Sequence, residues 1–297
     1  MSIDPDSLRR GLAFEEHRGQ LWRVAYRMLG SRAEAEDVVQ DAYLRWHKSG
    51  AQEVRSPRAW LVTTVTRLAI DRLRQLRVER ELYTGPWLPE PLVEASVPGA
   101  ELAAELASDL SVAFLAVLER LAPEERAAFL LQDVFDTGYG DIARILGKSE
   151  VACRQIVSRA RKRLRAARPR VQVNAARSAQ LVGAFVQAIK AQDRDAMLKL
   201  LANEATWTSD GGGKARAALK VIGGSERVAR FAVGAFRKLV ERVDFRAVTV
   251  NGEPGLVAFL DGALFAVFAF RTDGRHIIDV CTVLNPEKLR DVNVPPT

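Results

Sequence analysis

The chain has 297 residues, of which 48% are hydrophobic and 27% are charged. This length and composition are typical of a globular protein with two or three domains, and they exclude a disordered or fibrous chain. The formal net charge is +7, from 44 basic and 37 acidic residues, and the sequence pI is near 9.7, which indicates a polyanionic partner.

The sequence carries no signal for a membrane or a secretory pathway. No stretch approaches the roughly 18 apolar residues of a membrane helix, and the first residues lack the basic flank and apolar core of a signal peptide. Cys153 and Cys281 are too few for a disulfide scaffold or a four-ligand zinc site. We therefore expect a cytoplasmic protein that has no membrane partner, no metal site and no cofactor.

Residues 8–80 are predicted to form three helices. Residues 8–29 have apolar side chains at helical spacing, and Gly30 ends the pattern. Ser31 and Glu34 have the spacing of a capping box, which begins a second helix that runs to about residue 48. The third helix, residues 59–80, is basic at its far end.

Residues 81–100 are predicted to be an inter-domain linker. Four prolines and two glycines in this segment are incompatible with a regular helix. The simplest alternative is a flexible spacer, but Trp87 and Leu88 would then expose an unusual amount of apolar surface. We expect these two side chains to dock on a neighbouring domain.

Residues 101–168 are again helical. We expect one helix over 109–121, a second that begins at 123, a short third over 139–146, and a fourth that begins after a cap at Ser149 and runs to about 168. From residue 171 the pattern changes. One or two helices over 174–201 and a helix over 225–239 accompany five predicted strands, 205–209, 243–250, 256–260, 263–271 and 276–284. Helices followed by a run of antiparallel strands predict an α+β domain.

Residues 139–164 have the pattern of a helix-turn-helix. Cys153, Val157, Ala160 and Leu164 form one apolar stripe at spacings of four, three and four, which leaves the other face of that helix polar and basic. Residues 154–170 contain eight basic residues and no acid, so an ordinary hairpin with a basic outer face is the less favoured alternative. Arg154 and Gln155 suit base edges, Lys162, Arg163 and Arg165 suit phosphates, and Ser158 and Arg159 share the same surface.

Taken together, the three N-terminal helices and the helix-turn-helix pattern make residues 10–168 resemble a bacterial sigma factor of the extracytoplasmic-function class. Residues 35–46 (AEDVVQDAYLRW) resemble its helix that binds core polymerase, and residues 57–61 and 68–74 resemble its minus-ten-reading helix. Residues 121–126 and 158–165 resemble its minus-thirty-five-reading domain. The resemblance implies RNA polymerase core and promoter DNA as partners.

The same resemblance implies roles for individual side chains. Asp37, Gln40 and Asp41 would bind the polymerase, and Arg72, Arg74 and Arg77 would bind phosphates of the minus-ten strand. Arg67 also lies near DNA in this comparison, but many members of the class have Asn there, and many have a basic residue at the position of Ile156. The promoter preference therefore cannot be transferred.

Three further motifs resemble the group of these sigma factors that has a fused SnoaL-like domain. They are residues 87–92 (WLPEPL), 210–214 (DGGGK) and 285–289 (NPEKL). The resemblance implies a cone-shaped α+β barrel over about 174–291 that acts as a built-in regulator in place of a separate anti-sigma protein. The interdomain residues it implies are Trp87, Leu88, Asp210, Gly211, Gly212, Gly213, Lys214, Asn285, Pro286, Lys288 and Leu289.

Two features of the C-terminal part could form chemical sites. The glycines of the 210–214 motif could approach an anion, but the motif lacks the ending and spacing of a phosphate loop, so we expect a flexible loop tip that contacts another domain. His276 and Asp279 lie three apart on a predicted strand and face opposite sides, which argues against an acid–base pair.

The sequence therefore predicts a multidomain protein with two all-α sigma domains, the second a helix-turn-helix, followed by an α+β SnoaL-like barrel. The expected boundaries are 1–80, a linker over 81–100, 101–170 and 171–297. The expected function is promoter recognition and transcription initiation, with no catalytic residue. The alternatives are a SnoaL-type enzyme, which needs a paired acid and base, and a small-molecule sensor, which needs only an apolar pocket in the barrel.

Overall fold

The structure is a computed structural model that describes residues 5–48, 54, 56–93, 111–164 and 174–294. Its contacts divide the chain into two compact units. The helical unit is Met1–Glu81 with Val117–Ala166, and the sheet unit is Leu82–Ala116 with Ala167–Thr297. None of the described helices is long and apolar enough to cross a membrane.

The first part of the helical unit is a bundle of three helices, α1 (Pro5–Leu29), α2 (Arg32–Lys48) and α3 (Pro57–Glu81). Gly30 has a φ of 68° and ends α1, and the Glu34 N–H donates to the Ser31 Oγ at 3.4 Å, as the capping box predicts. The core lies between the helices and includes Leu21, Val38, Val39, Leu61 and Val65. The three helices predicted from the sequence are confirmed.

The second part of the helical unit contains α6 (Pro123–Asp133), α7 (Tyr139–Leu146) and α8 (Glu150–Leu164), and the short α5 (Val112–Leu118) precedes it. Pro123 stands at the first helical position, where its missing N–H costs nothing. Gly147, with a φ of 63°, ends α7, and the Ala152 N–H donates to the Ser149 Oγ at 3.2 Å at the start of α8. The predicted helix, glycine turn and cap are confirmed.

The sheet unit has six strands, β1 (Leu201–Asp210), β2 (Ile222–Gly223), β3 (Val243–Val250), β4 (Glu253–Leu260), β5 (Ala263–Thr272) and β6 (Ile277–Val283). Their order in the sheet is β2-β1-β6-β5-β4-β3, with β1 and β6 parallel and the other pairs antiparallel. The described strands therefore form an open, mixed sheet and not a closed barrel. The sequence missed β2 because two residues carry no periodicity.

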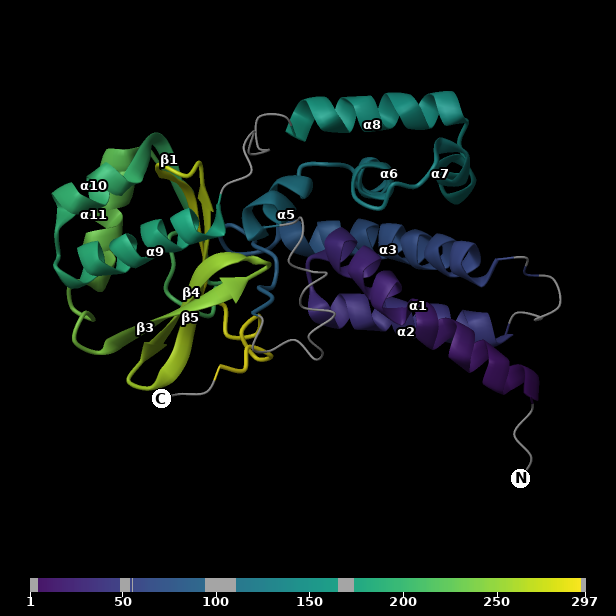
Figure 1. The fold of residues 1–297 in the computed structure, drawn as a ribbon, viewed down its shortest axis with the longest axis horizontal. Helices are drawn as coiled ribbons and strands as arrows, with labels where there is room; N and C mark the ends of the chain where they lie inside the picture. The colour runs from purple at the N-terminus through teal and green to yellow at the C-terminus, as the bar shows by residue number, and fades with distance from the viewer. Residues whose placement is uncertain (1–4, 49–53, 55, 94–110, 165–173, 295–297) are drawn as a thin grey trace. The chain divides into compact units, whose positions relative to one another are not determined.

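Different segments cover the two faces of this sheet (Figure 1). The helices α9 (Ala175–Lys190), α10 (Arg194–Leu200) and α11 (Ser225–Phe236) cover one face, over a core rich in aromatic rings: Phe185, Trp207, Phe231, Phe236, Phe245, Phe265, Phe268 and Phe270. The other face buries Val257, Val267 and Cys281 under Leu88 and Val93 of the linker, Val112 of α5 and Leu289 of the C-terminal tail.

His276 and Asp279 are apart, as their spacing predicted. Asp279 accepts hydrogen bonds from Arg271 and Thr206 within the sheet. The His276 Nδ1 lies 3.7 Å from a carboxylate oxygen of Asp273, in the turn that precedes β6. Both side chains thus have local structural partners.

Candidate nucleic-acid interface

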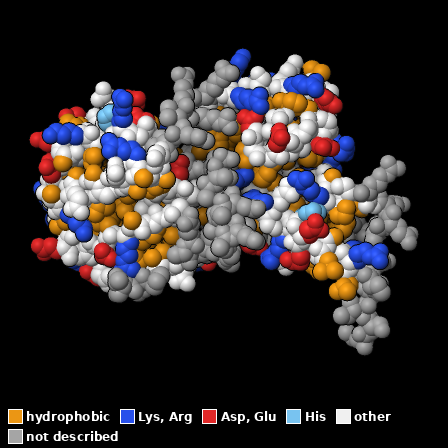
Figure 2. Space-filling model, viewed as in Figure 1, with side chains coloured by type: hydrophobic (Ala, Val, Ile, Leu, Met, Phe, Trp, Pro, Cys, Tyr) orange, Lys and Arg blue, Asp and Glu red, His pale blue; other side chains and the backbone are white. Residues whose placement is uncertain are grey.

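The helix α8 has one buried and one exposed face. Cys153, Ile156 and Val157 pack against Ala128 and Leu131 of α6 and against Ile142 and Ile145 of α7. Ile156 is therefore part of the buried face of α8. The described side chains of α8 that were predicted to bind DNA are exposed on the other face: Arg154, Gln155, Ser158, Arg159, Lys162 and Arg163. Lys and Arg side chains are visible along α8 in Figure 2. Arg165 lies outside the described residues.

Local contacts hold some of these cations in place. The Arg154 guanidinium donates to Glu150 at 2.9 Å and lies 5.1 Å from the ring centre of Tyr139. Arg163 donates to Glu125 at 2.6 Å. Within the described part of the chain, Lys162 has no ion-pair partner, so its ammonium is available to a phosphate.

The helix α2 presents an acidic face beside a buried one. Asp37, Gln40 and Asp41 are exposed, and Leu44, one turn further along, is 48% exposed on the same side. Ala35, Val38, Val39, Ala42 and Trp46 are buried on the opposite side. The three polar residues predicted to bind polymerase thus form one accessible surface.

The arginines of α3 are engaged within the helical unit. Arg67 donates to the Ile145 carbonyl at 2.9 Å and to the Arg144 carbonyl at 2.8 Å, at the end of α7. Arg74 donates to Glu124 of α6 at 2.7 Å. Other cations of this helix have partners in the first three helices: Arg72 pairs with Glu34, and Arg77 lies 3.9 Å from Glu81. Two of the arginines expected to bind DNA, Arg67 and Arg74, therefore donate to groups of α7 and α6 instead.

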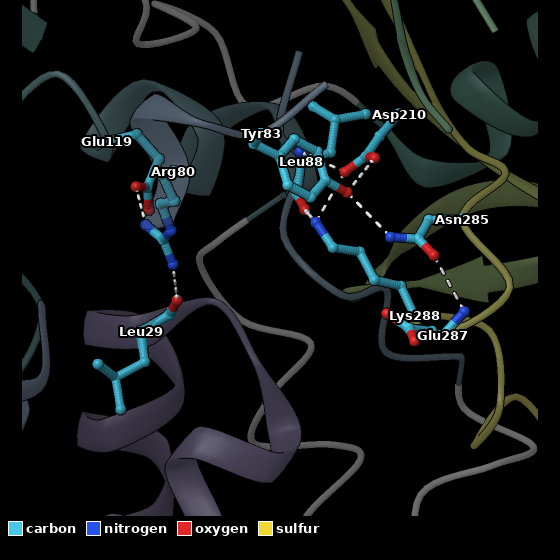
Figure 3. A network of polar contacts seen from close by, with 9 residues as sticks. All are labelled: Leu29, Arg80, Tyr83, Leu88, Glu119, Asp210, Asn285, Glu287 and Lys288. Carbon is cyan, nitrogen blue, oxygen red and sulfur yellow. Dashed lines mark hydrogen bonds and ion pairs between the residues drawn. The ribbon is translucent and has the colours of Figure 1, made fainter. Parts of the chain in front are cut away.

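A buried cluster of charges joins α3 to the start of α6. Glu119 accepts from both Arg80 and Arg126. Arg80 also donates to the Leu29 carbonyl at 2.8 Å, and Figure 3 shows Arg80 between Glu119 and Leu29. Arg126 is only 1% exposed, and its Nε and Nη2 have no hydrogen-bond partner among the described residues. Burial lowers the pKa of Arg80. Two guanidinium groups thus share one carboxylate.

In the sheet unit, Asp210 is the centre of a polar network that holds the linker (Figure 3). Asp210 is fully buried at the end of β1 and accepts hydrogen bonds from the Tyr83 hydroxyl at 2.6 Å and the Leu88 N–H at 2.8 Å. It also accepts from the Lys288 ammonium at 2.7 Å, and Asn285 donates to the Tyr83 hydroxyl at 2.9 Å. Burial and the adjacent carboxylate raise the pKa of Tyr83.

The linker residues pack closely on this network. The Lys288 ammonium also donates to the Leu88 carbonyl and lies 4.1 Å from the ring centre of Trp87. Leu88 is 1% exposed. Further along, the Leu92 N–H donates to the Asn251 side chain at 2.9 Å, and the Asn251 N–H donates to the Leu92 carbonyl at 2.8 Å. Linker residues 83–93 are therefore an integral part of the sheet unit.

The glycines after Asp210 are required because neighbouring atoms leave no room for a Cβ. Gly212 has a φ of 58°, and a Cβ there would lie 2.4 Å from Asn285 and 2.7 Å from the Tyr83 hydroxyl. A Cβ on Gly211 would lie 2.3 Å from the Ala215 carbonyl oxygen. The expectation of a flexible loop tip was wrong on this point: the segment is a tight turn packed against the linker. Lys214 pairs with Glu287 at its edge.

Several residues of these clusters were missed from the sequence. Tyr83 of the linker binds Asp210, Asn251 binds Leu92 of the linker, and Glu119 joins the two arginines of the helical unit. Tyr83 precedes the WLPEPL motif by four residues, and this closeness is the one signal that could have pointed to it. Asn251 and Glu119 both lie in turns and acquire their partners only in the tertiary structure.

Comparisons with known proteins match both helical regions. Residues 13–78 match the family model Sigma-70 region 2, and residues 111–164 match Sigma-70, region 4. The ECF RNA polymerase sigma factor SigJ of Mycobacterium tuberculosis is 43% identical over 251 residues, which are 82% of this chain and 78% of that protein. The chain belongs to the ECF RNA polymerase sigma factors.

Two further similarities agree with this assignment. The probable ECF RNA polymerase sigma factor SigI of Mycobacterium tuberculosis is 29% identical over 93% of both chains. The crystal structure of Mycobacterium tuberculosis SigJ covers 96% of this chain and 99% of its own, with a TM-score of 0.77 and 36% identity. The similarity therefore includes the C-terminal α+β domain, and the named relatives are sigma factors, not enzymes. The chain is a promoter-recognising sigma factor.

Proposed function

We propose that this sigma factor docks on core polymerase through the acidic face of α2, reads the two promoter elements with α3 and α8, and is regulated by its C-terminal domain through the linker. The observation that carries the regulatory part is the buried Asp210 carboxylate, which binds Tyr83, Leu88 and Lys288 at once. We also propose that the protein acts in the cytoplasm, beside the polymerase, and catalyses no reaction of its own.

The exposed face of α8 suits the major groove. Its first turns carry Arg154 and Gln155, whose donors and acceptors can pair with base edges. Lys162 lies further along the helix, where it can contact phosphates of the DNA backbone. The buried face of the same helix is fully used by packing against α6 and α7. These two properties together support the assignment of α8 as the recognition helix.

The arginine contacts of α3 support a closed form that must open for promoter binding. Elements at minus ten and minus thirty-five are roughly 25 base pairs apart, or about 85 Å at about 3.4 Å per base pair. In the helical unit, however, Arg67 and Arg74 of α3 bind groups of α6 and α7 directly. The same guanidinium donors cannot serve the helix-turn-helix and the DNA backbone at once.

The linker network offers a route by which the C-terminal domain can bias this opening. The linker follows α3 directly, and Asp210 and Asn251 hold it at two points, near Leu88 and near Leu92. A segment held in this way cannot extend freely between two promoter-reading regions. Loss of the contact would therefore change how readily the two regions separate.

Run-off transcription with purified core polymerase tests the proposal. We expect Asp210→Ala to change the transcript yield at fixed holoenzyme concentration, while Asp261→Ala, which removes an exposed carboxylate from the same domain, leaves it unchanged. Point variants suit this test because truncation after residue 170 would strip the apolar cover from Leu88, Val93 and Val112. If Asp210→Ala and the wild type give equal yields at every concentration, the C-terminal domain does not regulate through this contact.

The small-molecule sensor has less support. Aromatic side chains of the described residues occupy the interior of the sheet unit, where the sensor alternative would need an apolar pocket. The ring centres of Trp207 and Phe231 are 5.3 Å apart, and those of Phe185 and Phe270 are 5.0 Å apart. The proposed function accordingly needs no small molecule.

A further inference from the structure

The outward face of α8 carries one exposed apolar side chain among its polar and charged ones. Val151, the second residue of α8, is 62% exposed. It lines a surface hollow of about 510 Å³ together with Arg154, Gln155, Ser158 and Arg159. A β-branched side chain loses rotamer freedom in a helix, and its apolar surface faces water here. Helix stability therefore does not explain a valine at this position.

The place of Val151 is the part of a recognition helix that comes nearest to the bases. The N-terminal residues of such a helix contact base edges in the major groove. Val151 and Arg154 are three residues apart and thus lie side by side on one face. Arg154 is held by Glu150 and the Tyr139 ring, so the surface beside Val151 is already ordered.

The chemistry of the major groove offers one partner for an apolar side chain. The edges of the four base pairs present donors and acceptors, and the C5 methyl of thymine is the apolar group among them. We propose that Val151 is a specificity-determining residue that packs against the C5 methyl of a thymine, beside the base that Arg154 and Gln155 read. This inference rests on the proposed function, in which α8 enters the major groove.

Replacement of thymine by deoxyuridine tests the contact because it removes the methyl group and keeps every hydrogen-bonding group. The full-length chain with core polymerase first selects an upstream element from random duplexes, and each thymine of that element is then replaced in turn. At one position we expect wild-type binding to weaken about fourfold, the value of one buried methyl group. Val151→Ala should bind more weakly and lose the sensitivity at that position alone.

Val221→Ala is the matched control, since Val221 is 55% exposed but belongs to the C-terminal domain; its response to deoxyuridine should equal that of the wild type. The inference is wrong if the wild type and Val151→Ala respond alike at every thymine. It is also wrong if Val151→Ala impairs only the assembly with core polymerase, which would place Val151 in a protein contact. In both cases a retained preference for the selected element leaves the proposed function standing. Loss of all sequence preference in the wild type would overturn both.

Discussion

Removal of the Asp210 carboxylate should release the linker from the sheet unit. Asp210 is fully buried and accepts from Tyr83, Leu88 and Lys288, and the side chain of Lys288 is only 9% exposed. Loss of one partner of a buried ion pair costs about 3–5 kcal/mol because the other charge stays buried without compensation. Asp210→Ala should therefore weaken linker docking by this amount, which corresponds to roughly 10²- to 5 × 10³-fold in the docking equilibrium.

Amide hydrogen exchange measures this effect at a distance from the substitution. The Leu92 N–H donates to Asn251 and not to Asp210, so its protection reports docking of the linker and not the loss of its own acceptor. In Asp210→Ala we expect faster exchange at Leu92 by about two to nearly four orders of magnitude, whereas amides of β5 keep their protection. Asp210→Asn, which keeps an acceptor oxygen but loses the charge, should fall between Asp210→Ala and the wild type.

The matched control is Asp261→Ala, because Asp261 forms an exposed pair with Arg242 and its loss should leave exchange at Leu92 unchanged. Unchanged exchange at Leu92 in Asp210→Ala would refute the reasoning. Equal acceleration at Leu92 and in β5 would refute it as well, because the carboxylate would then stabilise the whole sheet and not the docked linker.

Four further predictions concern other sites. Asp37→Lys with Asp41→Lys should abolish binding to core polymerase in a pull-down while the circular dichroism spectrum stays unchanged, since an acidic docking surface becomes repulsive. Lys162→Ala should weaken binding to all DNA sequences alike and reduce the slope of log affinity against log salt by about one in fluorescence anisotropy titrations. Glu119→Gln removes the carboxylate that Arg80 and Arg126 share, so the helical unit should open more readily, and a distance measurement by energy transfer between α2 and α8 should report a larger separation. Burial raises the pKa of Glu253 from 4.5 to about 7, so the folded chain keeps the carboxyl proton up to a higher pH than the unfolded chain does. The free energy of unfolding should therefore fall by up to about 3 kcal/mol as pH rises from 4.5 to 7. Glu253→Gln should remove that part of the pH dependence in urea denaturation.

Local signals explain why much of the fold could be predicted from the sequence. The Ser31 cap, the glycine turn at Gly147 and the apolar stripe from Cys153 to Leu164 act over a few residues, and the structure places helix ends and buried faces where these signals predict them. The strand β3 covers residues 243–250 as predicted, because alternating side chains bounded by turns define it locally.

The remaining features depend on contacts between distant segments. Tyr83 and Asp210 are far apart in the chain, and nothing near Tyr83 indicates an acidic partner. Arg67 was expected at DNA, but its donors reach carbonyl groups at the end of α7, a contact that requires the folded arrangement of α3 and α7. The resemblance to sigma factors with a fused SnoaL-like domain indicates that the motifs at 87–92, 210–214 and 285–289 belong together. The structure adds the hydrogen bonds that connect these segments.

The central claim, that this chain directs core polymerase to promoters and opens them, is tested most directly by permanganate footprinting. Permanganate oxidises unpaired thymines, so the reactivity of promoter fragments reports strand opening. With core polymerase and the full-length chain, thymines downstream of the minus-ten element should become reactive, and the double substitution at Asp37 and Asp41 should abolish the signal. Equal reactivity with core polymerase alone, or with the doubly substituted chain, would contradict the account.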